Sequence, residues 1–196
     1  RGRLEATLEG IRAARAAGLA VRVNTVAMAG VNDDEFDALL AWCGAIGADL
    51  FLIETMPMGD TGEDRVAQYL SLDAVRRNLS QRWTLEPLAY QTGGPAQYVR
   101  VAQTGRRLGF ITPMSHNFCA SCNRVRLSCT GQLYTCLGQE EGVDLRHLLR
   151  GGATDAALEA AIQQAIARKP AGHDFLLDAL TGATSGPQRH MSVTGG

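Results

Sequence analysis

The chain has 196 residues, of which 45% are hydrophobic and 20% are charged, and 19 Lys and Arg against 20 Asp and Glu give a formal net charge of −1. This composition is typical of a soluble globular protein, and the near-zero charge excludes bulk electrostatic binding to nucleic acid or to an anionic membrane. No apolar stretch approaches the roughly 20 residues of a membrane span, and the first residues lack the pattern of a signal peptide. We therefore expect a cytoplasmic protein that can bury a real core.

Helical and strand patterns alternate in the first part of the chain. Apolar spacing predicts a helix near the start, a strand over 21–28, a helix from Asn32 to Gly47, a strand over 50–56 and a helix from Ser71 to about Arg82. Helices that alternate with buried strands predict βα units and a parallel sheet. Two such strands are too few for a complete α/β barrel or doubly wound sheet, so the chain looks like the end of a longer one.

The pattern changes after Pro87, where the expected elements become shorter. Apolar runs on either side of Gly-containing turns predict β-hairpins over 97–112 and 124–137, followed by helices over 144–150 and 155–168. We therefore expect two regions, 1–86 with the βα units and 87–196 as an α+β region with antiparallel hairpins.

Four of the five cysteines lie within one short stretch. Cys119 and Cys122 form a C-x2-C pair that can point two sulfurs at one ion, and the second hairpin brings Cys136 back toward them. Thiolates favour zinc or iron–sulfur centres, and these spacings alone do not separate the two. Cys129 falls midway between Cys122 and Cys136, so a four-thiolate site is also open. Cys43 lies on an apolar helix face and is expected in the core.

Two arginines follow the cysteine pair directly. In an extended strand, Arg124 and Arg126 project from the same face. Paired guanidinium groups beside a metal centre can clamp a phosphate through bidentate hydrogen bonds. The simpler alternative is a solvated strand face with two surface arginines, and the neighbouring cysteines favour the clamp.

These segments closely resemble a known family. Residues 118–128 (FCASCNRVRLS) and 131–137 (GQLYTCL) resemble the GTP 3′,8-cyclases, the molybdenum cofactor biosynthesis protein A family of radical S-adenosylmethionine (SAM) lyases. Further matches lie at 21–26, 30–35, 51–56 and 94–96, and at the closing pair Gly195 and Gly196.

The resemblance implies a fold and an activity. Residues 1–86 would be the C-terminal βα units of an incomplete TIM-type radical SAM barrel, and residues 87–196 would bind a 4Fe–4S cluster and GTP. In this family another 4Fe–4S cluster, in the N-terminal half, cleaves SAM to a radical that converts GTP to (8S)-3′,8-cyclo-7,8-dihydroguanosine 5′-triphosphate. The C-x3-C-x2-C loop that binds this other cluster does not occur in the sequence. The resemblance thus implies a C-terminal portion that is inactive by itself.

The resemblance also implies the roles of individual residues. The family's second cluster has three thiolate ligands, by position Cys119, Cys122 and Cys136, and its open iron binds the guanine base. The resemblance implies that Met56 contacts SAM and that the tail, Gly195 and Gly196, reaches the active site. The residues that it implies for GTP binding are Arg22, Arg124, Val125 and Arg126.

Two positions depart from the family pattern. Arg22 stands where many relatives have a lysine, so a planar fork replaces a compact ammonium. Cys129 stands where relatives usually have a serine, and we expect that it does not bind iron, because a fourth thiolate would close the site to GTP. GTP and SAM are the expected partners, and a homodimer is one open option for the assembly.

Two other classes of protein compete with this interpretation. The first is a non-enzymatic zinc module that uses Cys119, Cys122, Cys129 and Cys136. The second is a different radical SAM enzyme that carries an auxiliary cluster.

Overall fold

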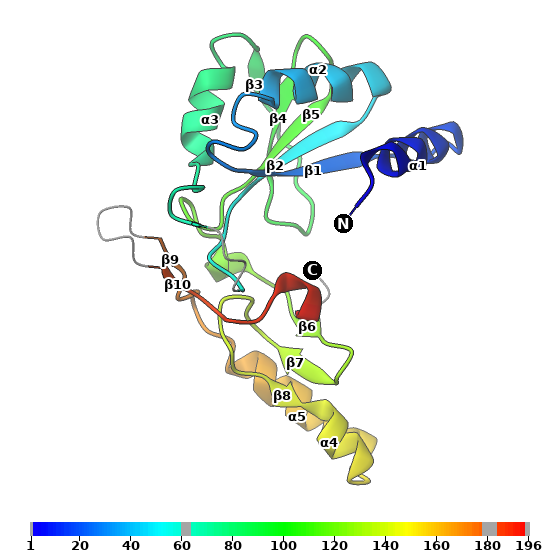
Figure 1. Ribbon diagram of the computed structural model, residues 1–196. Helices are drawn as coiled ribbons and strands as arrows, with labels where there is room; N and C mark the ends of the chain where they lie inside the picture. The colour runs from blue at the N-terminus through cyan, green and yellow to red at the C-terminus, as the bar shows by residue number, and fades with distance from the viewer. Residues whose placement is uncertain (1, 60–63, 178–183, 195–196) are drawn as a thin grey trace. The chain divides into compact units, whose positions relative to one another are not determined.

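The computed structural model describes residues 2–59, 64–177 and 184–194 (Figure 1). The chain forms two compact units, the first from Arg1–Thr55 and Leu70–Ser115, and the second from Met56–Tyr69 and His116–Gly196. No helix in the described part of the chain is long and apolar enough to span a membrane.

A five-stranded mixed sheet forms the centre of the first unit. Its strand order is β1-β2-β5-β4-β3, in which β2 pairs in parallel with β1 and β5, and β4 pairs antiparallel with β5 and β3. The bounds are β1 Arg22–Ala27, β2 Asp49–Glu54, β3 Leu85–Pro87, β4 Gln97–Val101 and β5 Arg107–Ile111. The predicted α/β class is confirmed, and the described residues form no closed barrel.

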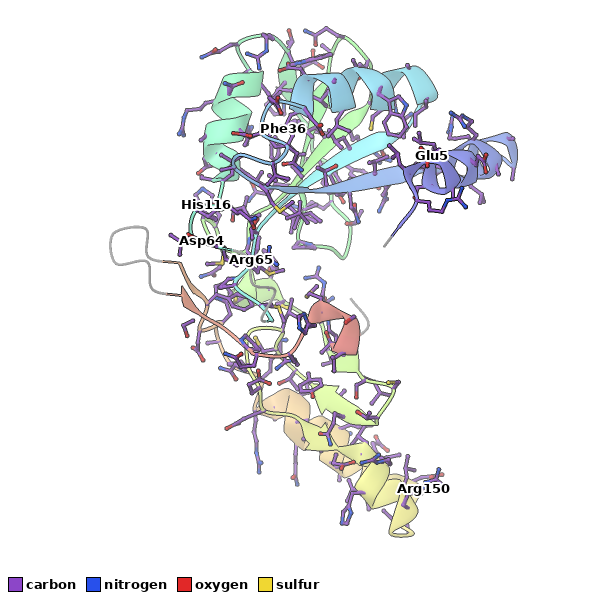
Figure 2. The ribbon with its side chains drawn as sticks, viewed as in Figure 1. Glu5, Phe36, Asp64, Arg65, His116 and Arg150 are labelled. Carbon is purple, nitrogen blue, oxygen red and sulfur yellow. The ribbon has the colours of Figure 1, made fainter. Side chains whose placement is uncertain are left out.

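Two of the three helices of the first unit pack on this sheet (Figure 1). The helices are α1 (Leu4–Ala16), α2 (Phe36–Ile46) and α3 (Leu72–Leu79). The core joins Phe36, Leu40 and Cys43 of α2 and Leu72, Val75 and Leu79 of α3 to apolar residues of β2, β4 and β5. Phe36 marks the start of α2 in Figure 2, whereas Glu5 lies on α1, which has no buried residue.

The turn after β1 differs from the sequence-based expectation. The helix expected to begin at Asn32 begins at Phe36 instead. The Asn32 side chain accepts a hydrogen bond from Met28 N and donates one to Val26 O, both at 2.9 Å, so it closes the turn and does not cap the helix. Gly47 ends α2 in the left-handed conformation at φ 67°, as predicted.

The hairpin predicted over 97–112 is present as β4 and β5, but it belongs to the main sheet. Residues Leu50 to Ile53 of β2 pair in parallel with Leu108 to Ile111 of β5. Strands from both sides of residue 87 therefore share one sheet, and the division into 1–86 and 87–196 stays a prediction.

The second unit is built on the other predicted hairpin. β6 (Arg126–Leu127), β7 (Gln132–Tyr134) and β8 (Val143–Asp144) form an antiparallel sheet, and Leu133 packs with Leu145 and Ala165 of the helices α4 and α5. The remaining elements are α4 (Leu145–Arg150), α5 (Asp155–Ala167), β9 (Leu176–Leu177), β10 (Thr184–Ser185) and the 3-10 helices η1 (Cys119–Ser121) and η2 (Met191–Thr194).

Candidate functional site

The C-x2-C pair lies on η1, a single tight turn. Cys122 N donates to Cys119 O at 3.1 Å, and Ser121 N donates to Phe118 O at 3.2 Å, so the backbone reverses between the two cysteines. Both thiols are free and half-buried. This is the spacing with which cysteine pairs hold one metal ion from a short loop.

The β6–β7 hairpin separates Cys136 from Cys129. Its register places Arg126 opposite Tyr134, so Cys136 lies beyond the open end of the hairpin, and Cys129 lies in the connecting turn at the other end. From Gly131 to Tyr134 the chain advances three residues at about 3.3 Å each, so the turn and the open end of the hairpin are roughly 10 Å apart. Cys136 is half-buried and Cys129 is exposed.

The charge of Arg126 interacts with Arg124 and with two of the cysteines. Burial is the largest cause that lowers the pKa of Arg126, and the Arg124 guanidinium lowers it further, whereas the sulfurs of Cys122 and Cys136 raise it. Each of these side chains therefore lies within electrostatic range of Arg126. The structure thus brings together both arginines and two of the three predicted ligands.

The two arginines of the predicted pair differ in their place relative to the hairpin. Arg124 and Arg126 are half-buried, and Val125 between them is 42% exposed. The Arg124 guanidinium carbon lies 5.7 Å from the centroid of the Phe118 ring, next to the first cysteine. The regular strand begins at Arg126, so Arg124 lies just outside it.

The other predicted contacts lie elsewhere in the chain. Arg22 is the first residue of β1 in the first unit, is exposed, and places its guanidinium carbon 5.5 Å from the centroid of the Phe51 ring. Met56 follows the carboxyl end of β2 and is half-buried. Gly195 and Gly196 lie outside the described residues.

Sequence reasoning missed two cations that contact the Cys136 segment. Lys169 donates to Arg124 O at 2.8 Å and to Thr135 O, and Arg189 donates to Cys136 O at 3.2 Å. No motif marks either residue, because their partners are backbone carbonyls, which carry no sequence signal.

The donors of this region are thiolates, which suit a zinc or an iron–sulfur centre in chemistry. No group of three or more His, Cys, Asp or Glu side chains within the described ranges is arranged to hold a metal ion. Three half-buried free thiols nevertheless belong to one unit, and two of them interact with the charge of Arg126. Thiolate donors beside a guanidinium suit an anionic thiolate-bound cluster.

The cysteine pair on η1 and Cys136 after β7 belong to the same unit as two half-buried arginines, and together they define a candidate thiolate metal site. The profile of one family, Molybdenum Cofactor Synthesis C, matches residues 48–175, and the chain belongs to this family.

Three similar proteins share the name GTP 3′,8-cyclase. Proteins named GTP 3′,8-cyclase from Rhodopseudomonas palustris (strain TIE-1) and Paracoccus denitrificans (strain Pd 1222) are each 56% identical to this chain, over its whole length and over 56% and 57% of their own. The protein of that name from Mesorhizobium japonicum is 53% identical over 59% of its length. The chain thus spans little more than half the length of the curated relatives it matches. The resemblance inferred from the cysteine–arginine segment is confirmed.

Proposed function

We propose that this chain is the GTP-binding portion of a GTP 3′,8-cyclase in molybdenum cofactor biosynthesis, with Cys119, Cys122 and Cys136 as ligands of a 4Fe–4S cluster. The observation that carries this proposal is the turn η1, which holds two half-buried free thiols and is followed directly by the half-buried Arg124 and Arg126. Membership of the Molybdenum Cofactor Synthesis C family and the names of the relatives support the reaction class. SAM would be the second substrate of the complete enzyme.

Three thiolates are a suitable number for this task. A bound 4Fe–4S cluster with three protein ligands supplies one open iron site, at which a nitrogen or oxygen of the guanine base can bind. Cys129 lies in the turn and Cys136 follows the open end, and these two ends of the hairpin are roughly 10 Å apart. This separation favours the three-thiolate set over the four-cysteine zinc module, which needs all four sulfurs around one ion.

The arginine pair would bind the phosphates of GTP. Arg126 is half-buried and its pKa is lowered by burial and by Arg124, so two like charges lie close together where hydration is reduced. A triphosphate reduces the repulsion between the two guanidinium groups because it neutralises their charge. It also replaces their lost hydration because it accepts bidentate hydrogen bonds from each of them. The pair thus holds and orients the nucleotide.

The remaining expectations belong to the same proposal. We assign β1 and β2 to the fifth and sixth strands of a TIM-type radical SAM barrel, with domains 1–86 and 87–196. Met56 follows the carboxyl end of β2, the end at which barrel enzymes bind ligands, which supports a contact with SAM. Contacts of Arg22 and Val125 with GTP, and an active-site role for Gly195 and Gly196, are carried over from the family.

Calorimetry of GTP binding to the anaerobically reconstituted chain tests the proposal. Arg126→Ala removes charge-assisted hydrogen bonds and should weaken GTP binding by about tenfold or more. Arg150→Ala is the matched control, because Arg150 is an exposed cation at the end of α4 (Figure 2). Equal affinities of the wild type and Arg126→Ala would reject the phosphate clamp. No SAM cleavage by the chain alone is expected.

A further inference from the structure

Three consecutive backbone carbonyls around Cys136 accept hydrogen bonds from two cationic side chains. Lys169 donates to Thr135 O, and Arg189 donates through Nη2 to Cys136 O at 3.2 Å and to Leu137 O at 2.8 Å. We propose that Lys169 and Arg189 are positioning residues that orient the Cys136 thiolate and place positive charge beside the cluster. This inference rests on the proposed function.

Lys169 bridges the two chain segments at the open end of the hairpin. Its ammonium also donates to Arg124 O at 2.8 Å, so it joins the segment after Cys122 to the residue before Cys136. The paired residues of β6 and β7 end at Arg126 and Tyr134, so this bridge lies beyond the last ladder pair. Lys169 forms no ion pair among the described residues.

Arg189 fixes the other side of the Cys136 segment. Its side chain is 7% exposed, and its guanidinium carbon lies 4.3 Å from the centroid of the Tyr134 ring. It pairs with Glu140 Oε2 at 3.1 Å, and Glu140 Oε1 accepts from Gln188 N at 2.5 Å. The Tyr134 ring and the Glu140 carboxylate therefore hold the buried guanidinium group of Arg189 while it donates to the backbone carbonyls of the Cys136 segment.

These contacts constrain the backbone of a metal ligand. Fixing the carbonyls of Thr135, Cys136 and Leu137 fixes the peptide planes on both sides of Cys136, and thereby the direction of its Cα–Cβ bond. Groups that orient ligands in this way commonly change metal affinity or activity by about 10–100-fold when they are removed. Positive charge near a cluster also favours its reduced form, since reduction adds negative charge.

A capping role for α5 is the competing explanation of Lys169. A lysine at the end of a helix often binds the last helical carbonyls. The recorded acceptors of Lys169 belong instead to the segments that flank β6 and β7. The last turn of α5 is closed by backbone bonds, with Lys169 N donating to Ile166 O at 3.0 Å.

Two readouts on the reconstituted chain test this inference, the rate of iron release to a chelator and the cluster reduction potential followed by EPR. Lys169→Gln removes a charge and should lower the potential and release iron about tenfold faster. Arg189→Lys keeps the charge and loses the fork, so it should release iron faster at a nearly unchanged potential. Arg168→Gln is the control, because Arg168 precedes Lys169 and is exposed.

The outcomes separate the two proposals. A wild-type chain that takes up no iron and sulfide would overturn the proposed function. A wild type that does so, with Lys169→Gln matching Arg168→Gln in potential and in iron release, would overturn this inference alone. A structural role would lower the unfolding midpoint of the metal-free variant without moving the potential of its folded fraction. If Lys169→Gln does not fold, Arg189→Lys decides, because wild-type iron release in that variant would overturn the inference.

Discussion

At the residue scale, Cys43 differs from the other four cysteines in its environment. It is 1% exposed in the core of the first unit, and burial, followed by the charge of Asp49, raises the pKa of its thiol to about 11. The prediction that Cys43 lies in the core is confirmed. Its helical face distinguished it, because Leu39, Leu40 and Ile46 recur on the same side of α2.

The raised pKa predicts a pH dependence of stability. The folded chain holds the Cys43 proton up to pH of about 11, whereas the unfolded chain releases it near the ordinary value of 9.0. The contribution of the Cys43 thiol to the free energy of unfolding is fully present below pH 9. It is lost as the pH rises toward 11, and the loss is on the order of 2 kcal/mol. Urea unfolding across this range should show a shallower decline for Cys43→Ala. Equal declines in the unfolding free energy of the wild type and of Cys43→Ala would show that Cys43 does not contribute to the pH dependence.

Glu54 is a buried carboxylate that the sequence did not single out. It is 1% exposed, accepts from Leu72 N at 3.2 Å, from Met114 N at 2.9 Å, and from both the backbone and the hydroxyl of Ser115. One side chain thereby ties the start of α3 to the segment after β5, which leads toward Cys119.

Replacing Glu54 should therefore destabilise the first unit. Glu54→Ala leaves buried amide donors without acceptors, and we expect a loss of about 3 kcal/mol in the free energy of unfolding. Glu86→Ala on β3 is the control, because Glu86 is exposed. Urea unfolding of the two variants makes the comparison. A loss from Glu54→Ala no larger than that from Glu86→Ala would mean that the hydrogen bonds are not needed.

At the element scale, Gly131 sets the turn of the β6–β7 hairpin. Its φ is 83°, and an added Cβ would lie 2.6 Å from Arg146 Cβ. Gly131→Ala should destabilise the chain by about 2 kcal/mol, from left-handed strain and the close contact together. Gly105→Ala in the β4–β5 hairpin is the matched control, because its φ is 66° and no atom lies within 4 Å. Equal losses of unfolding free energy would mean that Arg146 moves away without cost.

Helices and strands could be predicted where the sequence signal was local, whereas the pairing between distant strands could not be predicted. Alternating apolar residues and a turn glycine predicted both hairpins, and a terminal glycine predicted the end of α2 at Gly47. Whether β5 would join β2 depends on contacts between distant residues, such as Leu52 opposite Phe110. The same limit explains why Lys169, which binds the carbonyls of Arg124 and Thr135, left no signal in the sequence.

At the scale of the whole molecule, the chain has two compact units with separate apolar cores. The first has parallel βα pairing between β1, β2 and β5. The second contains the cysteine turn and the arginine pair, and its Lys169 and Arg189 bind the carbonyls around Cys136. Because the proposed ligands Cys119, Cys122 and Cys136 all lie in the second unit, cluster binding can be tested on that unit's residues within the intact chain.

Metal analysis after anaerobic reconstitution tests the central claim most directly. Iron, sulfide and zinc per chain should be measured for the wild type, Cys129→Ser and Cys136→Ser. We predict iron and sulfide in the equal amounts of a 4Fe–4S cluster in the wild type and in Cys129→Ser, with loss of most of both in Cys136→Ser, because Cys129 lies at the other end of the hairpin. Stoichiometric zinc in the wild type that is lost in Cys129→Ser would contradict the account and establish the four-cysteine zinc module.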